Sequence, residues 1–385
     1  MNKLKVMTVF GTRPEAIKMA PLVKELEKNS NIQSLVCVTA QHRQMLDQVL
    51  SAFNIVPDFD LNIMKDKQTL VGITTRGLEG LSEVFGREKP DIVLVHGDTT
   101  TTFVGSLAAF YNQISVGHVE AGLRTYDKYS PFPEEMNRKL TGTIADIHFA
   151  PTKANKSNLL KEGIKEEDIV VTGNTVIDAL KTTVNKDYVF EDETLRNLDF
   201  TGKRVIAVTA HRRENLGEPL ENIFNALLDI ANKYTDVLII DPVHLNPAVS
   251  EVAERILGDH SRVRLIEPIG VLDMHNLMDR SYLVMTDSGG LQEEAPSLGK
   301  PVLVLRNETE RPEAVEAGTV RIAGTDRDNI FKLACQMLDS TEEYNKMAKS
   351  VNPYGDGNAS SRIVKALLKK YNISDEEVSQ FNVSK

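Results

Sequence analysis

The stretch IVLVHGDTTTT, residues 92–102, joins a continuous apolar run to a polar word that begins with Gly97 and Asp98. A short apolar run without polar alternation is typical of a strand that is buried on both faces of a parallel sheet. The alternation of such runs with helical patterns predicts an α/β protein with parallel sheets. The runs are Leu4–Phe10, Leu35–Thr39, Ile92–His96, Val116–Val119, Val205–Thr209, Val237–Ile240, Val263–Ile266, Tyr282–Thr286 and Val302–Leu305.

Two domains are expected from the length of 385 residues and from a charged and polar stretch, 185–203, that separates two sets of strands. Each set suits a doubly wound, Rossmann-like sheet, and we expect the two domains to face each other across a cleft. The predicted domains are residues 1–172 and 173–354, followed by a C-terminal segment, residues 355–385. That segment should hold a helix that crosses back to the N-terminal domain, and then a polar tail, because apolar residues recur with helical spacing at Ile363, Leu367, Leu368 and Tyr371.

The composition argues against several classes of protein. Lysine and arginine number 45 against 55 aspartate and glutamate, a formal charge of −10, which disfavours nucleic-acid binding through bulk charge. An anionic ligand must therefore be held by a few local cations. Cys37 and Cys335 are the two cysteines, so neither a disulfide framework nor a thiolate metal site is expected. No apolar stretch has the length of a membrane span or the form of a signal peptide, so we expect a cytoplasmic protein without a membrane partner.

Acidic residues follow two strands of the first half. Asp98 follows Ile92–His96, and Glu120 follows Val116–Val119. Asp98 alone could equally cap the next helix, but two strand ends that carry acids indicate a site. The glycine-rich dinucleotide fingerprint is absent, so NAD is not expected. His118 and Glu120 have the spacing found in zinc deaminases, but the cysteine pair of those enzymes is missing, and no metal is predicted.

The segment SPFPEEMNR, residues 130–138, places Glu134 and Arg138 four residues apart on one face of a helix. Met136 and Leu140 lie roughly opposite and are expected to pack on the domain. One interpretation is a surface helix with an ordinary ion pair between Glu134 and Arg138. The other is a third carboxylate of the same site, which the two preceding acids favour.

Polar segments also follow the predicted strands of the second half. His211 and Arg212 follow its first apolar run and His244 follows the next, where a phosphate or leaving group would lie. The word TDSGGLQEE, residues 286–294, joins a strand to a helix start whose backbone N–H groups could bind an anion. Glu294 could accept hydrogen bonds from ribose hydroxyls. These features fit a nucleoside diphosphate, although a glycine pair can also mark a plain tight turn.

Several longer sequence motifs, spread over nearly the whole chain, are similar to those of a known family. They are FGTRPEAIKMAP (10–21), TAQHRQMLDQVL (39–50), VHGDTTTT (95–102), VGHVEAGLRT (116–125), SPFPEEMNR (130–138), VTGNTVIDAL (171–180), AHRREN (210–215), PVHLNP (242–247), TDSGGLQEEAPSLGKPVL (286–303), TERPEAVEAGT (309–319) and NPYGDG (352–357). In these words the chain resembles the bacterial non-hydrolysing UDP-N-acetylglucosamine 2-epimerases. The resemblance implies a GT-B type fold, a homodimer, and reversible conversion of UDP-GlcNAc into UDP-ManNAc for cell-envelope glycans. Asp241 stands where that family commonly has Tyr.

The resemblance also implies roles for individual residues. Elimination of UDP to a 2-acetamidoglucal and its re-addition would invert C2, which requires acid–base groups and cations that stabilise the departing diphosphate. No cofactor is implied. The implied catalytic residues are Asp98, Glu120, Glu134, Arg138 and His211. The implied substrate ligands are Arg13, Lys18, Ser288, Gly289, Gly290, Glu294 and Arg311. The implied contacts of a second UDP-GlcNAc, an allosteric activator, are Gln41, Gln44, Gln68, Arg212 and His244.

Three other hypotheses stay open at this point. A hydrolysing relative would release ManNAc and UDP instead of UDP-ManNAc. A GT-B glycosyltransferase would share the fold, but the sequence shows no amphipathic surface for a membrane or an acceptor. A UDP-sugar sensor without turnover would need the nucleotide site but not three convergent carboxylates.

Overall fold

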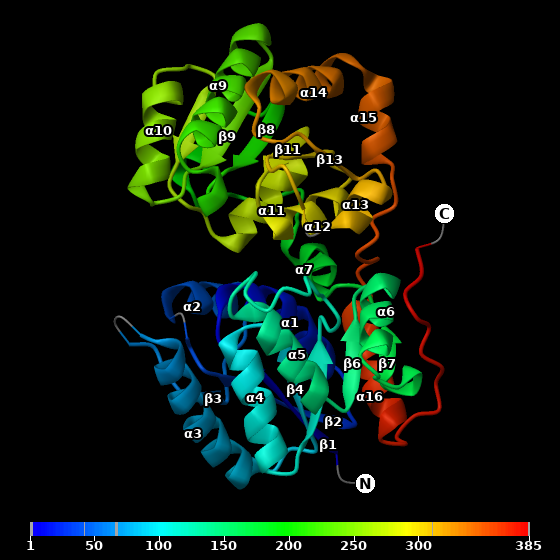
Figure 1. Cartoon of the computed structure of the whole chain (residues 1–385). Helices are drawn as coiled ribbons and strands as arrows, with labels where there is room; N and C mark the ends of the chain where they lie inside the picture. Colours follow the sequence, from blue (N-terminus) through cyan, green and yellow to red (C-terminus); the bar gives the residue numbers. More distant parts are fainter. Residues whose placement is uncertain (1–2, 42, 66–67, 310, 384–385) are drawn as a thin grey trace. The chain divides into compact units, whose positions relative to one another are not determined.

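The structure, a computed structural model, describes residues 3–41, 43–65, 68–309 and 311–383. The chain divides into two compact units (Figure 1). The first unit runs to Thr182 and resumes at Tyr354–Asn382, and the second is built on Thr183–Pro353. The boundaries expected from the sequence fall after residues 172 and 354.

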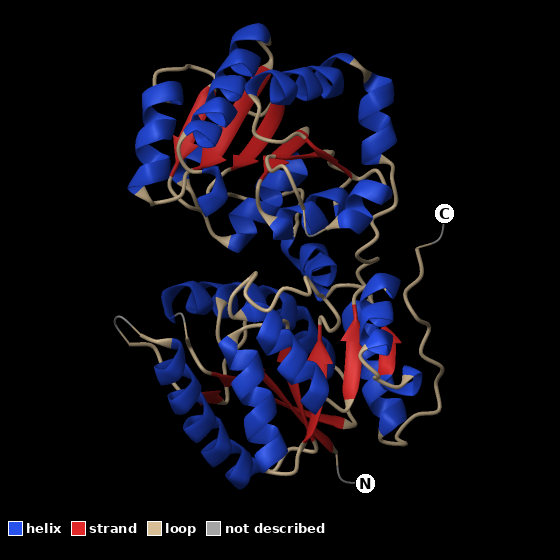
Figure 2. Ribbon diagram, in the orientation of Figure 1, coloured by secondary structure: helices blue, strands red, loops and turns tan. Residues whose placement is uncertain are grey.

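The first unit is a parallel sheet packed against helices (Figure 2). Within the described residues its sheet has seven strands in the order β3-β2-β1-β4-β5-β6-β7. The order reverses between β1 and β4, and α/β sheets bind ligands at such a point, outside the carboxyl ends of the strands. The strands are β1 (Leu4–Phe10), β2 (Ile32–Val38), β3 (Phe59–Asp60), β4 (Ile92–His96), β5 (Ser115–Val119), β6 (Ile147–Ala150) and β7 (Ile169–Val171). The helices are α1 (Arg13–Glu27), α2 (Arg43–Ala52), α3 (Leu70–Glu88), α4 (Thr100–Tyr111), α5 (Glu134–Ile144), α6 (Lys153–Lys161), α7 (Thr175–Thr183) and α16 (Ala359–Lys370).

The second unit repeats this architecture with a shorter sheet. In the described part of the chain the sheet has six parallel strands in the order β10-β9-β8-β11-β12-β13, which reverses between β8 and β11. The strands are β8 (Arg204–Thr209), β9 (Val237–Pro242), β10 (Val263–Ile266), β11 (Leu283–Thr286), β12 (Val302–Val304) and β13 (Val320–Ile322). The helices are α8 (Glu193–Arg196), α9 (Glu218–Lys233), α10 (Pro247–Leu257), α11 (Val271–Arg280), α12 (Gly289–Ser297), α13 (Pro312–Glu316), α14 (Arg327–Asp339) and α15 (Thr341–Ala348).

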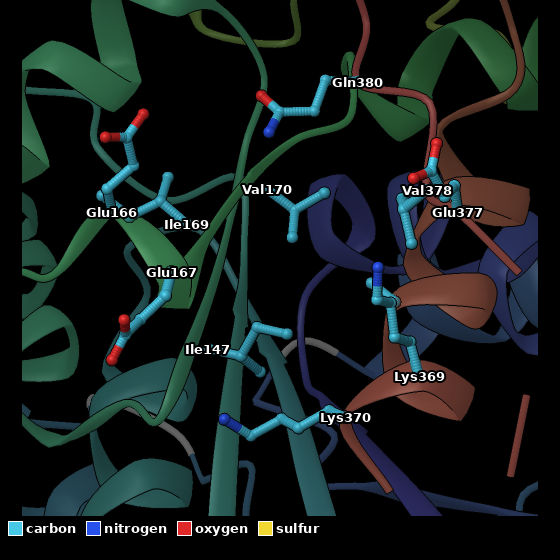
Figure 3. A pocket seen from close by; sticks show the side chains of 11 residues that line it. Ile147, Glu166, Glu167, Ile169, Val170, Lys369, Lys370, Glu377, Val378 and Gln380 are labelled. Atoms are coloured by element: carbon cyan, nitrogen blue, oxygen red, sulfur yellow. The ribbon is translucent and has the colours of Figure 1, made fainter. Parts of the chain in front are cut away.

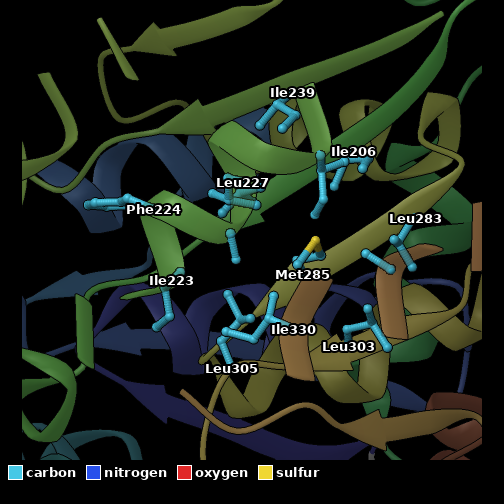
Figure 4. Packing of buried hydrophobic residues seen from close by; sticks show 14 of the residues in the cluster. Ile206, Ile223, Phe224, Leu227, Ile239, Leu283, Met285, Leu303, Leu305 and Ile330 are labelled. Atoms are coloured by element: carbon cyan, nitrogen blue, oxygen red, sulfur yellow. The ribbon is translucent and has the colours of Figure 1, made fainter. Parts of the chain in front are cut away.

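Each sheet packs its apolar residues against the helices that flank it. In the second unit Met285 of β11 and Ile206 of β8 belong to one buried cluster with Phe224 of α9 and Ile330 of α14 (Figure 4). In the first unit a cluster of the same kind joins β1, β2, β4 and β5 to α3 and α4. Burial of such side chains is the main favourable contribution to folding, and it holds the strand ends in fixed positions.

The predicted fold class is confirmed, with two parallel α/β sheets. The C-terminal helix also returns to the first unit as expected, because α16 packs on α1 with Ile363 and Leu367 buried. Short strands β3, β6, β7 and β13 lie outside the apolar runs that the sequence analysis identifies. None of the helices in the described ranges combines the length and the apolar character that a bilayer span requires.

Candidate active site

Glu120 is the centre of a cluster at the carboxyl end of β5. Its carboxylate forms an ion pair with Lys18 of α1, and its Oε2 accepts a hydrogen bond of 2.8 Å from Nδ2 of Asn174. Nε2 of His96 lies 3.8 Å from the same oxygen. Glu120 has a φ of 61°, which non-glycine residues rarely adopt and which recurs at functional sites. Two residues that were predicted for different roles, Glu120 and Lys18, are therefore in contact.

Asp98 follows β4 and is held by side chains of α5. Nη2 of Arg138 lies 2.5 Å from Oδ2 of Asp98, and Nδ2 of Asn137 donates to the backbone oxygen of Asp98 at 2.9 Å. The N-cap of α4 is Thr99, whose Oγ1 accepts a hydrogen bond from the backbone N–H of Thr102 at 3.1 Å. The interpretation of Asp98 as a helix cap is therefore wrong. Asp98 and Arg138, both predicted to be catalytic, form an ion pair.

The expected orientation of α5 is wrong. Met136 and Leu140 are 36% and 40% exposed, whereas Glu135 is fully buried. The carboxylate of Glu135 accepts hydrogen bonds from the backbone N–H groups of residues 125 and 126 and pairs with Arg138 at 3.1 Å. Backbone N–H groups in partly buried positions need acceptors, and here Glu135 on the inward face of α5 supplies them. Glu135 thereby supports Arg138, a role that the sequence did not indicate.

Glu134 is the first residue of α5. Arg138 pairs with Asp98 and Glu135, so the Glu134–Arg138 ion pair of the surface-helix interpretation is not formed among the described residues. Oε2 of Glu134 is buried and has no hydrogen-bond partner in the part of the chain that the structure describes. A buried carboxylate oxygen without a partner is costly, so this one is suited to receive a hydrogen-bond donor from a ligand.

Arg13 begins α1, and Glu15 fixes the loop before it. Both carboxylate oxygens of the buried Glu15 are used: Oε2 accepts from the backbone N–H groups of Gly11 and Thr12 at 3.0 and 2.8 Å. Oε1 accepts from the hydroxyl of Thr99 at 2.7 Å. Burial raises the pKa of Glu15, and the hydrogen bonds act in the opposite direction. Glu15 thus ties the end of β1 to the loop that carries Asp98.

Three histidines lie buried in the sheet behind this edge. His96, His118 and His148 stand on the adjacent strands β4, β5 and β6, and burial lowers their pKa values to about 4, 3 and 4. They are therefore neutral at physiological pH. Nε2 of His118 lies 2.8 Å from the backbone oxygen of Gly97, which fixes the turn before Asp98.

In the second unit Asp287 anchors the loop after β8. Its Oδ2 accepts hydrogen bonds from the backbone N–H groups of His211 and Arg212 at 2.7 and 2.8 Å and from Nδ2 of Asn215 at 3.0 Å. The His211 ring stacks on that of His244 at a centroid distance of 5.3 Å. Burial lowers the pKa of His211, while Asp287 raises it. No role is predicted for Asp287 from the sequence, although its place directly after β11 is a usable signal.

Ser288, Gly289 and Gly290 form the start of α12, as predicted, with Ser288 at the N-cap. The hydroxyl of Ser288 makes no capping hydrogen bond to α12. A helix start of this kind presents backbone N–H groups to an anion. Glu294 lies one turn later, and its Oε2 is 3.4 Å from Nε2 of the buried His275.

Arg311 is directed at the same helix. Its guanidinium forms an ion pair with Glu293 of α12, and its backbone N–H donates to Oγ1 of Thr309 at 3.1 Å. The predicted UDP ligand Arg311 thus contacts α12 at Glu293, where its charge offsets a buried carboxylate.

The residues predicted to contact an activator fall into two groups. In the first unit Nε2 of Gln68 donates to the backbone oxygen of Gln41 at 3.1 Å, and Gln44 is exposed on α2. Oγ1 of Thr101 donates to Oε1 of Gln41, also at 3.1 Å, which links Gln41 to the start of α4. Arg212 and His244 belong to the second unit.

Asp241 is a buried carboxyl at the end of β9. Burial, together with the negative charge of Asp287, raises its pKa to about 8. A tyrosine, which is common here in the family that the sequence resembles, would bring no such charge. Asp241 is therefore a buried acid next to a second acid.

A groove of about 510 Å³ lies at the amino ends of β6 and β7, in the first unit (Figure 3). Its walls combine apolar residues such as Ile147 and Val170 with the charged side chains of Glu167 and Lys370. None of the predicted site residues lines it. The groove is thus at the opposite ends of these strands from the carboxylate cluster.

Comparison with known proteins gives one consistent result. Residues 24–368 match the family model of UDP-N-acetylglucosamine 2-epimerase. The chain is 63% identical over 382 residues to the UDP-N-acetylglucosamine 2-epimerase of Bacillus subtilis, a match that covers 99% of each chain. It is also similar to the solved structure of the Neisseria meningitidis UDP-GlcNAc 2-epimerase bound to UDP-GlcNAc, with a TM-score of 0.86, 54% identity and coverage of 95% of this chain and 100% of that one. For the Methanocaldococcus jannaschii enzyme in complex with UDP-GlcNAc and UDP, the TM-score is 0.77 and the identity 35%, over 95% of this chain and 99% of that one.

Proposed function

Because the chain belongs to the UDP-N-acetylglucosamine 2-epimerase family, we propose that it interconverts UDP-GlcNAc and UDP-ManNAc without releasing the free sugar. The observation that carries this proposal is the cluster at the carboxyl edge of the first sheet. There Glu120 is paired with Lys18, and Asp98 is paired with Arg138. Glu134 has a buried oxygen without a hydrogen-bond partner in the described part of the chain. Such a set of carboxylates suits proton transfer.

The reaction has to move a proton that is not acidic. C2 of an N-acetylhexosamine has no neighbouring carbonyl group, so direct removal of its hydrogen as a proton is unfavourable. Loss of UDP from C1 with the bonding electron pair, together with transfer of the C2 proton to a carboxylate, gives a neutral 2-acetamidoglucal and UDP. Return of a proton to the opposite face of C2 and attack of UDP on C1 then complete the inversion.

The residues divide between the two halves of this reaction. Asp98, Glu120 and Glu134 would hold and return the proton, with Arg138 paired to Asp98 and Lys18 paired to Glu120. His211 and Arg13 would act beside the departing diphosphate. The start of α12 at Ser288–Gly290 would hold the phosphates through backbone N–H groups, with Arg311 nearby. Glu294 would accept hydrogen bonds from the ribose hydroxyls.

The proposed function also includes the activation of the enzyme, its oligomeric state and its role in the cell. A second UDP-GlcNAc would activate the enzyme through Gln41, Gln44, Gln68, Arg212 and His244, and no cofactor would be needed. The enzyme would act in the cytoplasm as a homodimer and supply ManNAc for cell-envelope polysaccharide. Light scattering after size-exclusion chromatography tests the dimer, and a sigmoidal dependence of rate on UDP-GlcNAc tests the activation.

Incubation with UDP-GlcNAc in deuterated water tests the central proposal. We expect deuterium at C2 of both nucleotide sugars and an equilibrium mixture of UDP-GlcNAc and UDP-ManNAc. Release of free ManNAc and UDP in equal amounts would identify a hydrolysing enzyme instead. Absence of both exchange and product would refute an epimerase.

A further inference from the structure

Asn174 is a buried residue to which neither the sequence analysis nor the proposed mechanism assigns a role. It follows β7 in the word VTGNTVIDAL and is 3% exposed. Its Oδ1 accepts a hydrogen bond of 3.1 Å from the backbone N–H of Val176, at the start of α7. The side-chain amide atom that accepts a backbone N–H must be the oxygen, because the amide nitrogen can only donate. The nitrogen Nδ2 is therefore the atom that faces Glu120. The bond of 2.8 Å from Nδ2 to Oε2 of Glu120 is thus assigned by the geometry of the loop.

The loop that carries Asn174 is itself held from behind. The backbone N–H of Asn174 donates to the backbone oxygen of Tyr354 at 2.6 Å, where the chain returns to the first unit. Gly173 has a φ of 85°, and a Cβ there would lie 3.2 Å from Cα of Gly355. Only glycine allows this close approach in that backbone conformation. The return segment therefore fixes the distance of Asn174 from Glu120.

Glu120 is a residue whose side chain needs such support. Its backbone is in the left-handed region, and its Oε2 receives both the ammonium of Lys18 and the amide of Asn174. Lys18 has a flexible stem and brings a charge, whereas Asn174 is short, buried and neutral. A donor of the second kind fixes orientation without adding a counter-charge.

We propose that Asn174 is a positioning residue that holds the carboxylate of Glu120 in the orientation needed for proton transfer at C2, with the Tyr354–Gly355 return segment as its support. The inference rests on the proposed epimerase function. It concerns a residue that acts through Glu120 and does not itself touch the reacting atoms.

Two variants of Asn174 and one control test this role. Asn174→Ala removes the donor, and Asn174→Asp keeps the size of the side chain and an acceptor for Val176 but replaces the donor by a negative charge. Asn112→Ala is the matched control, because Nδ2 of Asn112 donates to the backbone oxygen of Ala108 at the far end of α4, away from the site. Deuterium exchange at C2, kcat, KM, the pH–rate profile and the melting temperature are measured for each.

For Asn174→Ala we expect kcat and the C2 exchange rate to fall together by about 10- to 100-fold, with KM within about threefold of the parent value, because a misplaced catalytic group affects the chemical step. Asn174→Asp should also move the acidic limb of the pH–rate profile to higher pH, since a nearby negative charge makes Glu120 harder to ionise. A purely structural role would lower the melting temperature without moving that limb. Asn112→Ala should keep the parental profile.

The outcomes separate the two levels of the proposal. Parental kcat and an unmoved pH profile in both Asn174 variants, with exchange intact in the parent protein, would overturn the role of Asn174 alone. No exchange in the parent protein would refute the epimerase function, and this inference with it. If Asn174→Ala fails to fold, the pH–rate profile of Asn174→Asp decides whether Asn174 positions Glu120.

Discussion

The carboxyl edges of the two sheets have the same architecture, but their acidic residues have different partners. In the first unit Glu120 and Asp98, which follow β5 and β4, are paired with Lys18 and Arg138. In the second unit Asp287 turns its Oδ2 inward to the backbone N–H groups of the following loop. That loop carries His211 and Arg212, and Ser288, the residue after Asp287, is the N-cap of α12. Under the proposed function the first edge would transfer protons and the second would hold an anion, and these acids differ in whether they pair with cations or with backbone N–H groups.

The largest effect should come from the acids of the first edge. Glu120→Gln and Asp98→Asn keep the shape of each side chain but remove its proton-transfer capacity, so we expect turnover to fall by about 10²- to 10⁴-fold. UDP binding, measured by calorimetry, should stay within about threefold of the parent value. Parental rates in both variants would contradict the assignment of proton transfer to this edge.

The next effect concerns the inward-facing acids that anchor each edge, Glu15 and Asp287. Glu15→Ala leaves buried N–H and hydroxyl donors without acceptors, so the free energy of unfolding should fall by about 2–4 kcal/mol. Asp287→Ala should act in the same way on the second unit. Urea titrations followed by circular dichroism measure both. A loss below about 1 kcal/mol in either variant would show that the anchor is dispensable.

Asp241 makes the stability of the second unit depend on pH. Its folded pKa of about 8 lies above the ordinary aspartate value of 3.8, so between these values the folded state binds a proton that the unfolded state has lost. Stability therefore falls as pH rises through this window. Asp241→Asn removes the cost, so it should stabilise the protein by about 1–3 kcal/mol at pH 8 and by less at pH 5.

Melting temperatures of the parent and of Asp241→Asn at several pH values measure this difference. The gap between the two should widen from pH 5 to pH 8. A gap that stays constant would mean that Asp241 is already ionised when folded.

The smallest effect should come from an exposed ion pair far from both edges. Nζ of Lys24 lies 3.0 Å from Oε2 of Glu27 on the surface of α1. Glu27→Gln should change the free energy of unfolding by no more than about 0.5 kcal/mol, because solvent screens the pair. It should leave turnover unchanged. A larger loss of stability than in Glu15→Ala would contradict the ranking of buried over exposed carboxylates.

The fold could be predicted because parallel strands are continuous apolar runs. β4 and β10 begin and end where their runs do. Strands β3 and β7 could not be identified in this way, since they have two and three residues. A segment of that length has no period of its own and becomes a strand through pairing with a longer neighbour.

The site could be predicted only as far as the strand ends determine it. Asp98 and Glu120 follow strands, so their common edge is expected. Glu135 and Asn174 were missed because their roles depend on which face a helix turns inward and on what lies behind a loop. Hydrophobicity favoured Met136 and Leu140 for the buried face of α5, but the backbone N–H groups before that helix required a carboxylate there.

The return of residues 354–382 to the first unit makes that unit discontinuous in sequence. During synthesis the second unit's segment leaves the ribosome whole, while the nascent first unit still lacks α16 and exposes the apolar surface of α1 that this helix covers. The unit that begins to emerge first is therefore the last to be completed.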